Sequence, residues 1–354
     1  MAGTLDDPAV LARFDVSGMA GRVGRLGPQL RDGWAQTRRL TLPPAYREAT
    51  AVAVLGMGGS AIGADLVRAV FAERLKVPLV AVRDYPLPAF AGPTTLVVAS
   101  SHSGATEETV AAATEALARR CPIAVIATGG PLVDMAAQDA LPLLRFEPEA
   151  QPRAAAGWGV ILLSGLLERA GLLDVEDDEV EAAAARAEER FAACASDVPT
   201  EDNAAKQLAW TLLDRLPVVI GAGHLAAVAR RWKTQVNENA KSWAAWDELP
   251  EATHNTVAGL LQPENVREHL FAVFLASPAD HPRNALRREA LAAILEAVGT
   301  SHVRIDVEGA GRLAQAFDAI VLGDLVSVYL AVLYGIDPTP VVAIQALKER
   351  MAGG

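Results

Sequence analysis

The sequence has little that would suit an exported or membrane-spanning protein. Its 354 residues include two cysteines, Cys121 and Cys194, whose separation fits neither a metal site nor a small disulfide framework. We expect both thiols to be free and buried. No uninterrupted apolar run reaches the ~18 residues of a membrane span, and the stretch from Met1 to Phe14 lacks the apolar core of a signal peptide. The expected location is therefore the cytoplasm.

Positive charge is also scarce. The chain has 43 acidic and 32 basic residues, so its formal net charge is -11, and no basic stripe stands out. This composition argues against a nucleic-acid partner. A chain so acidic would have to bind a phosphate group locally, with hydroxyls, backbone N–H groups and a few placed cations.

Short apolar runs alternate with helical stretches in the first half of the chain. We predict strands over residues 51–55, 79–82, 95–100, 123–128 and 141–146, and helices over 61–73 and 106–119. Continuous apolar strands separated by helices indicate a parallel sheet that is buried on both faces. The pattern therefore predicts a doubly wound α/β domain.

A second α/β rhythm follows a long helical region. The later strands are expected at 216–221, 270–275 and 302–307, and the later helices at 285–298, 322–334 and 340–351. Two domains also suit the length, since domains commonly have roughly 100–200 residues. We predict an N-terminal segment plus first domain over 1–155, a connecting helical region over 156–200, and a second domain with a C-terminal helix over 201–354.

The first predicted strand ends in a glycine-rich loop, GMGGS, that runs from Gly56 to Ser60. Glycines let a backbone approach a ligand closely, and the N-terminus of the next helix offers free N–H groups to a phosphate. Two other interpretations stay open. Ser60 could simply be the N-cap of that helix. The spacing to Ala61 also fits a relaxed dinucleotide fingerprint, with Asp84 placed as a ribose-binding acid, which would suit a nicotinamide-dependent dehydrogenase.

A hydroxyl-rich loop, SSHSGATEE, follows the third predicted strand. Ser101, Ser103 and Thr106 crowd around one helix start, where a cap would need a single hydroxyl. Three hydroxyls predict a multidentate anion site, and two such loops at the carboxyl ends of different strands predict one phosphate held between them. Arg153 lies just before a later helix, where it could close over the anion or be a solvated surface arginine.

One acid and one histidine are the candidates for proton transfer. Glu238 stands between Asn237 and Asn239, which suggests a positioned carboxylate, and His254 lies in a predicted turn. General acid–base catalysis needs a base that takes up a proton, and a histidine adds a group that titrates near pH 7. Each residue also has an ordinary structural interpretation, as a surface acid and a turn histidine. No His, Cys or carboxylate spacing resembles a metal site.

Taken together, these stretches resemble the bifunctional phosphoglucose/phosphomannose isomerases, a family built from sugar isomerase (SIS) domains. The resemblance runs from about residue 15 to the end and rests on residues 56–65 (GMGGSAIGAD), 101–109 (SHSGATEET), 151–157 (QPRAAAG), 221–241 (GAGHLAAVARRWKTQVNENAK), 250–255 (PEATHN) and 335–348 (GIDPTPVVAIQALK). It implies two doubly wound SIS domains. It also implies a cytosolic, metal-independent and cofactor-free isomerase that interconverts an aldose 6-phosphate and fructose 6-phosphate.

The resemblance also implies roles for particular residues. The phosphate ligands would be Gly59, Ser60, Ser101, Ser103 and Thr106, with Arg153 nearby. Glu238 would shuttle the proton between C1 and C2 through an enediolate, and Lys348 would stabilise the developing oxyanion. His254 would assist ring opening and would be contributed across the interface of a homodimer.

Several positions depart from the pattern of the family. His102 stands where relatives usually have tyrosine, Ala105 replaces an asparagine, and Thr256 stands where an acid is common. These departures bear on the choice of substrate more than on the fold. They leave open an isomerase of a different sugar phosphate, or a sugar-phosphate sensor without catalysis.

Overall fold

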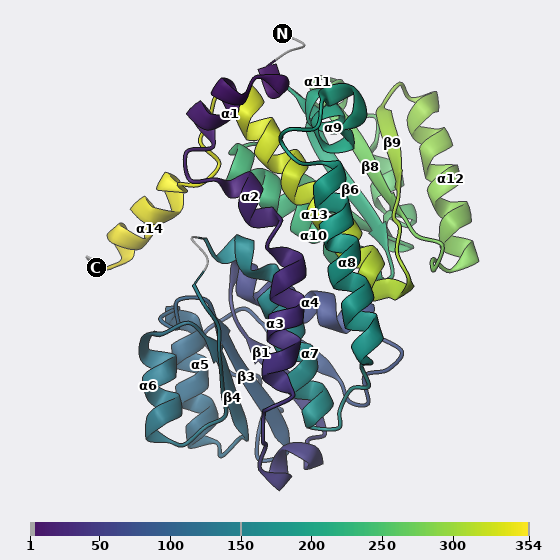
Figure 1. Ribbon diagram of the computed structural model, residues 1–354. Coiled ribbons are helices and arrows are strands. Elements are labelled where there is room, and N and C mark those ends of the chain that lie inside the picture. Colours follow the sequence, from purple (N-terminus) through teal and green to yellow (C-terminus); the bar gives the residue numbers. More distant parts are fainter. Residues whose placement is uncertain (1–3, 149–150, 353–354) are drawn as a thin grey trace. The chain divides into compact units, whose positions relative to one another are not determined.

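The computed structural model describes residues 4–148 and 151–352 (Figure 1). The chain forms two compact units, and each unit is assembled from separate stretches of sequence. Unit 1 comprises Met1–Gly24, Glu189–Val307 and Asp318–Gly354, and unit 2 comprises Arg25–Glu188 and Glu308–Phe317. The sequence analysis placed domain boundaries at residues 155 and 200, and these boundaries stay a prediction.

Unit 2 contains a sheet of five parallel strands. These are β1 (Ala51–Leu55), β2 (Leu79–Val82), β3 (Thr95–Ser101), β4 (Ile123–Ala127) and β5 (Leu143–Arg145). Their order is β2-β1-β3-β4-β5, and every neighbouring pair is parallel. Chain order reverses between β1 and β3, so the crevice beyond the carboxyl ends of these two strands is where a doubly wound sheet binds its ligands.

Helices cover both faces of this sheet. They are α3 (Leu26–Thr37), α4 (Gly58–Val70), α5 (Glu107–Ala118), α6 (Gly130–Gln138), α7 (Ala156–Arg169) and the first part of α8 (Asp177–Ala193), with short turns η2 (Pro44–Glu48) and η3 (Pro152–Ala155). Figure 1 shows α5 and α6 on one side of the strands, with α3 and α7 on the other. A buried cluster joins α5 and α6 to alternate strand residues such as Val97 and Val125. Burial on both faces explains why the strands are apolar throughout.

Unit 1 contains a second parallel sheet. Its strands are β6 (Leu216–Ala222), β7 (Ala245–Leu249), β8 (Leu270–Ala276) and β9 (Ser301–Asp306), in the order β7-β6-β8-β9. This order repeats that of the first four strands of unit 2. The prediction of parallel α/β sheets is therefore confirmed. Strand β7 was not predicted, because its sequence AWDEL carries two acids and lies at the sheet edge, where side chains are only half-buried.

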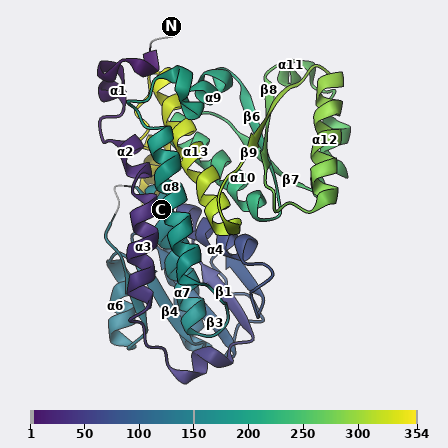
Figure 2. The same cartoon turned by 45° about the vertical axis from the view of Figure 1, so that its right-hand side comes forward.

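The helices of unit 1 are α1 (Pro8–Phe14), α2 (Met19–Val23), α9 (Ala204–Leu212), α10 (His224–Gln235), α11 (Glu264–Arg267), α12 (Pro282–Ala297), α13 (Gly311–Leu333), whose first turns belong to unit 2, and α14 (Val342–Ala352). Some of them, among them α10 and α12, pack on the sheet. Short turns are η1 (Thr4–Asp6), η4 (Thr200–Asp202), η6 (Glu251–Thr253) and η7 (Thr256–Gly259), and a π-helix, η5, covers Val236–Ala240. Figure 2 shows α12 on one side of β8 and β9, with α10 and α13 on the other.

Helix α13 is long and apolar enough to cross a membrane, yet 94% of its apolar window is buried inside the protein. Its two buried acids are paired: Asp318 accepts two hydrogen bonds from Arg190, and Asp324 forms an ion pair with Arg231. These features are typical of the central helix of a packed core. The prediction from sequence placed the start of this helix at residue 322, eleven residues after its observed start at Gly311.

Candidate active site

The loop after β1 brings Ser60 to the loop after β3. Gly58 has a φ of +48° and begins α4, whose N-cap residue is Met57. The Ser60 hydroxyl lies inside the first turn and accepts a 3.2 Å hydrogen bond from the backbone N–H of His102. The interpretation of Ser60 as an N-cap is therefore wrong. Its hydroxyl joins the two loops instead.

The loop after β3 folds its own hydroxyls together. The hydroxyl oxygens of Ser101 and Thr106 lie 2.8 Å apart, and Ser101 Oγ also accepts a 3.1 Å bond from the backbone N–H of Gly104. Ser103 Oγ accepts from the N–H of Ala105 at 3.2 Å. Thr106 is the N-cap residue of α5, but its side chain makes no capping bond. The hydroxyls therefore shape the loop and leave the helix start to be satisfied in another way.

Gly104 allows this loop to close. Its φ is +66°, and a Cβ at this position would lie 1.7 Å from the carbonyl oxygen of Gly129. Only a residue without a side chain fits such a contact. The glycine therefore fixes the path of the hydroxyl-rich loop.

Arg153 approaches the same region from the turn η3. Its side chain is only 2% exposed, and its Nη1 lies 3.4 Å from Oε1 of Gln151. A Cβ on Gly59 would lie 3.1 Å from the carbonyl oxygen of Pro152, so η3 packs directly on the first loop. A small cavity is lined by both loops and by η3, with Gly59, Ser60, His102, Phe146 and Pro152 in its wall. Arg153 is therefore a buried residue whose backbone adjoins Gly59, and the interpretation as a solvated surface arginine is wrong.

The sequence reasoning overlooked Arg83, which follows β2. Its guanidinium forms an ion pair with Asp65 of α4 and donates a 3.2 Å bond to the carbonyl oxygen of Ala61. Asp65 is 5% exposed. These two contacts, both made by Nη2 of Arg83, tie the first turns of α4 to the end of β2. The signal available in the sequence was a charged residue at the carboxyl end of an otherwise apolar strand.

Glu238 lies in the π-helix of unit 1 that continues α10. Such single π-turns are frequent at functional sites because they change the direction in which a side chain points. The two flanking amides are both anchored: Asn239 donates a 2.8 Å bond to Ser327 Oγ, and Asn237 donates a 2.7 Å bond to the carbonyl oxygen of Ser242. Glu238 itself is half-buried. Its carboxylate is thus carried by a backbone that is fixed on both sides.

His254 follows the turn η6 and is exposed. Its backbone N–H donates a 2.8 Å bond to the carbonyl oxygen of Glu251, and the side chain of Asn255 donates to Glu251 Oε1 at 2.6 Å. The departure at Thr256 has a local explanation, since its hydroxyl bonds Asp247 Oδ2. These contacts hold the turn and leave the imidazole at the surface of unit 1.

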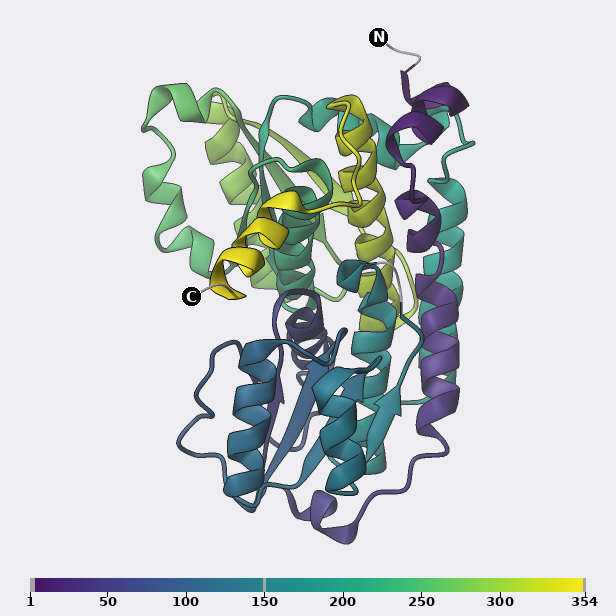
Figure 3. The ribbon, with the colours of Figure 1, turned by 90° about the vertical axis from the view of Figure 1, so that its left-hand side faces the viewer.

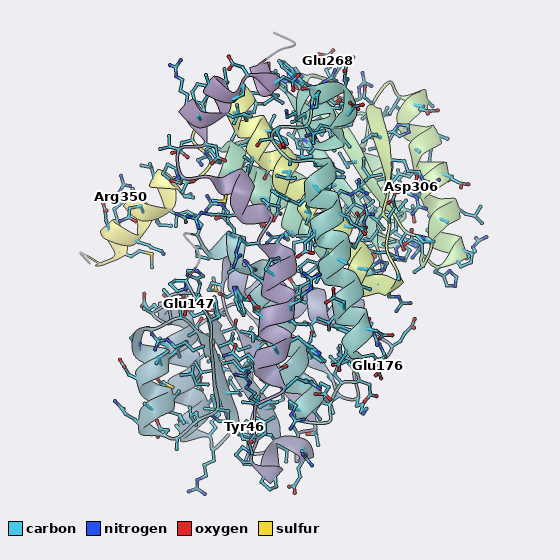
Figure 4. The ribbon with its side chains drawn as sticks, in the orientation of Figure 1. Tyr46, Glu147, Glu176, Glu268, Asp306 and Arg350 are labelled. Atoms are coloured by element: carbon cyan, nitrogen blue, oxygen red, sulfur yellow. The ribbon has the colours of Figure 1, made fainter. Side chains whose placement is uncertain are left out.

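Lys348 lies on α14, the last helix. Figure 3 shows that an extended linker separates α14 from α13, and Figure 4 labels Arg350 on the same helix. Lys348 is exposed, as are its neighbours Leu347 (58%) and Val342 (74%). Glu238, His254 and Lys348 are thus carried by three different elements of unit 1. Their shared role in one reaction stays a prediction.

The structure also bears on redox and metal chemistry. Cys121 and Cys194 are free and buried, as predicted, and burial raises the pKa of both thiols. Within residues 4–148 and 151–352, no group of three or more His, Cys, Asp or Glu side chains is arranged to hold a metal ion.

The repeated sheet order, with two candidate phosphate loops at the switch point of unit 2, is that of a doubly wound α/β protein. Residues 201–351 match the family described as the bacterial phospho-glucose isomerase C-terminal SIS domain. The fold is similar to the crystal structure of a glucose-6-phosphate isomerase like protein from Thermus thermophilus. That match has a TM-score of 0.63 and 22% identity, and it covers 96% of this chain and 98% of that one.

Closer relatives identify the family. The chain is 36% identical to the bifunctional phosphoglucose/phosphomannose isomerase of Caldicellulosiruptor bescii, over 93% of this chain and 98% of that protein. It is 34% identical to the bifunctional phosphoglucose/phosphomannose isomerase of Aquifex aeolicus, over 84% and 88% of the two chains. The protein therefore belongs to the bifunctional phosphoglucose/phosphomannose isomerase family, as its sequence motifs suggested. The dehydrogenase alternative is set aside.

Proposed function

We propose that this protein interconverts glucose 6-phosphate with fructose 6-phosphate through an enediolate, with mannose 6-phosphate as a second substrate, and without a metal. The observation that carries the proposal is the fixed position of the turn that contains Glu238. Its π-turn is anchored by Asn237 and Asn239, in a chain that is 36% identical over 93% of its length to a named isomerase of these sugars. A fixed carboxylate is what proton transfer between two adjacent carbons requires.

The loops after β1 and β3 would form the phosphate site. The ligands would be the hydroxyls of Ser60, Ser101, Ser103 and Thr106, the backbone at Gly59 and the starts of α4 and α5, where N–H groups favour an anion. Arg153 would add a buried positive charge beside them, which a dianionic phosphate would neutralise. This arrangement suits a local anion site in a chain whose net charge is -11.

Three further residues would carry the chemistry of the reaction. His254 would protonate the ring oxygen as the anomeric hydroxyl loses its proton, which opens the pyranose. Glu238 would then take the proton from C2 of the aldose and return it to C1, while one proton moves from the C2 hydroxyl to the oxygen on C1. Lys348 would stabilise the oxyanion of the enediolate, where negative charge appears only during the reaction.

We also propose that the working form is a cytoplasmic homodimer in which His254 serves the site of the partner. The exposure of His254 and the apolar, exposed surface of α14 support an assembly larger than one chain. The two free thiols support a reducing compartment.

A coupled assay tests the proposal. Purified protein in EDTA is given glucose 6-phosphate and mannose 6-phosphate separately, and fructose 6-phosphate is followed. Turnover of both sugars is the expected result. Turnover of one would assign the departures at His102, Ala105 and Thr256 to specificity, and turnover of neither would contradict the proposal.

A second candidate is a sugar-phosphate sensor that binds without turnover. The observation in its favour is His102, whose ring packs edge-on against Phe146 in the cavity wall, where relatives usually have tyrosine. Thermal stabilisation by fructose 6-phosphate without turnover of either aldose would favour this candidate.

A further inference from the structure

Lys241 directs its ammonium group into a cluster of four backbone carbonyl oxygens. Two belong to the turn that carries the candidate base: Lys241 Nζ lies 2.9 Å from the oxygen of Glu238 and 3.1 Å from that of Asn239. The other two are the oxygens of Asp337 and Pro338, at 3.0 and 2.8 Å. We call these contacts the Lys241 clamp.

The first two contacts supply donors to carbonyl groups at the end of the π-helix. The last carbonyl groups of a helix have no partner within it, and a positive charge placed there also interacts favourably with the helix dipole. An ammonium has three N–H donors, so it can serve several carbonyls at once. Lys241 therefore closes the turn that contains Glu238.

The backbone of Lys241 adopts a left-handed conformation, which is unusual for a residue with a side chain. Its φ is +53°, in the left-handed region, and it is the C-cap residue of the π-helix. This conformation is unfavourable for a residue with a side chain, so glycine or asparagine usually occupies such a position. The left-handed conformation ends the π-helix at Lys241. The side chain of Lys241 then contacts the carbonyl oxygens of Glu238 and Asn239 in the turn that precedes it.

The other two contacts reach a distant part of the sequence. Asp337 and Pro338 lie in the linker between α13, which ends at Leu333, and α14, which begins at Val342. The linker is also tied within itself, since the N–H of Thr339 donates a 2.8 Å bond to Asp337 Oδ1. The clamp thus joins the turn of Glu238 to the segment that leads to Lys348.

We propose that Lys241 is a positioning residue: its ammonium holds the backbone of Glu238 in register with the linker to α14 and thereby sets the geometry of proton transfer. The inference rests on the proposed function, in which Glu238 is the base. It assigns Lys241 no contact with substrate. Because Lys241 is not one of the candidate phosphate ligands, loss of the clamp is expected to slow the reaction while leaving substrate affinity unchanged.

The test compares three variants by steady-state kinetics on glucose 6-phosphate. Lys241→Met removes the donors but keeps the length of the side chain, and Lys241→Arg keeps a cation with several N–H donors. Lys76→Met is the matched control, since the side chain of Lys76 is exposed and ion-paired with Asp174. We expect Lys241→Met to lower kcat by about ten- to a hundredfold with KM within about twofold, as a displacement of a reacting group by about 1 Å would. Arginine is expected to restore most of the rate, and Lys76→Met to match the wild type.

Hydrogen exchange of the backbone amides in residues 236–241 and 336–341 tests the Lys241 clamp without relying on activity. Faster exchange in both segments of Lys241→Met, and in neither segment of Lys76→Met, is expected. Unchanged kcat, a rise in KM alone, or unchanged exchange would each overturn the inference. If Lys241→Met does not fold, Lys241→Gln, which keeps N–H donors but has no charge and a shorter reach, is measured instead, and a wild-type kcat with wild-type exchange in that variant would overturn the inference. A wild-type protein that turns over neither sugar would contradict the proposed function instead. Hydrogen exchange in residues 236–241 and 336–341 of the variants would still test the clamp.

Discussion

The hydroxyl oxygens of Ser101 and Thr106 lie 2.8 Å apart at the start of α5. Thr106 is the N-cap residue of that helix, and a threonine there would ordinarily bond the helix's own N–H groups. Its hydroxyl instead pairs with Ser101, whose side chain also receives the N–H of Gly104. The loop is therefore built from hydroxyls that bond one another, next to a helix N-terminus that favours an anion.

Replacing either hydroxyl should weaken substrate binding. We expect Ser101→Ala and Thr106→Val to raise KM for glucose 6-phosphate by about tenfold each, because one hydrogen bond to a charged group contributes about 1.5–3 kcal/mol. Thr114→Val is the matched control: Thr114 is also in α5, but it is exposed and bonds only the carbonyl oxygen of Val110. A KM that does not change in Ser101→Ala and Thr106→Val would remove these hydroxyls from the phosphate site.

Glu238→Gln should abolish turnover and leave binding largely intact. An amide keeps the shape of the side chain but cannot accept the proton, and loss of a general base commonly costs about 10²–10⁴ in rate. Isothermal titration with fructose 6-phosphate checks that the variant still binds. Glu248→Gln, at an exposed acid of β7, should behave as the wild type. A Glu238→Gln enzyme with normal turnover would exclude this residue as the base.

The pair Arg231–Asp324 is the clearest stability test, since the two side chains are only 1% and 3% exposed. Arg231→Met leaves Asp324 charged in the core and should lower the free energy of unfolding by about 3–5 kcal/mol in urea titrations. Replacing Arg304, whose pair with Asp306 (labelled in Figure 4) is exposed at 51% and 66%, should change it by less than about 1 kcal/mol. Equal effects of the two replacements would show that burial does not set the cost.

Stability should fall at strongly alkaline pH because of a buried tyrosine. Burial raises the pKa of Tyr46 to about 12, although its hydroxyl donates to the carbonyl oxygen of Ile123, and burial also raises the pKa of Tyr329. Above about pH 10 the unfolded chain loses these protons while the folded chain keeps them, so folding becomes less favourable as pH rises.

We expect the free energy of unfolding to drop between pH 10 and pH 12 by an amount that shrinks in Tyr46→Phe. Phenylalanine cannot ionise, so the part of the slope due to Tyr46, up to about 1.4 kcal/mol per pH unit, should disappear. Guanidinium titrations at pH 8, 10 and 11 measure the slope. An unchanged slope in the variant would mean that Tyr46 titrates equally in the folded and unfolded states.

The strands of unit 2 could be predicted closely from the sequence. Strand β2 was expected over the observed residues, and β1, β3 and β4 agree to within one residue, because burial on both faces leaves a continuous apolar run between glycines or polar loops. β7 was missed because an edge strand keeps polar side chains. The π-helix was missed as well, since no periodicity distinguishes one wide turn from the end of an α-helix.

The candidate phosphate residues show a similar division. Their grouping in unit 2 followed from their place at the carboxyl ends of neighbouring strands, which a parallel sheet brings together. The burial of Arg153, the bond from the N–H of His102 to Ser60, and the role of Arg83 were not accessible, because each depends on a partner far away in the chain.

By itself, the sequence determined the α/β class, the parallel sheets, the position of the two candidate phosphate loops and the membership of an isomerase family. These follow from local patterns, namely the spacing of apolar residues, glycines at strand ends and short motifs. Only the tertiary structure decided how Glu238 is held, through Asn239 on Ser327 and through Lys241 on Asp337 and Pro338. The physical reason is that a hydrogen bond depends on distance and angle, and both are set here by segments about 90 residues apart that meet only when the chain folds.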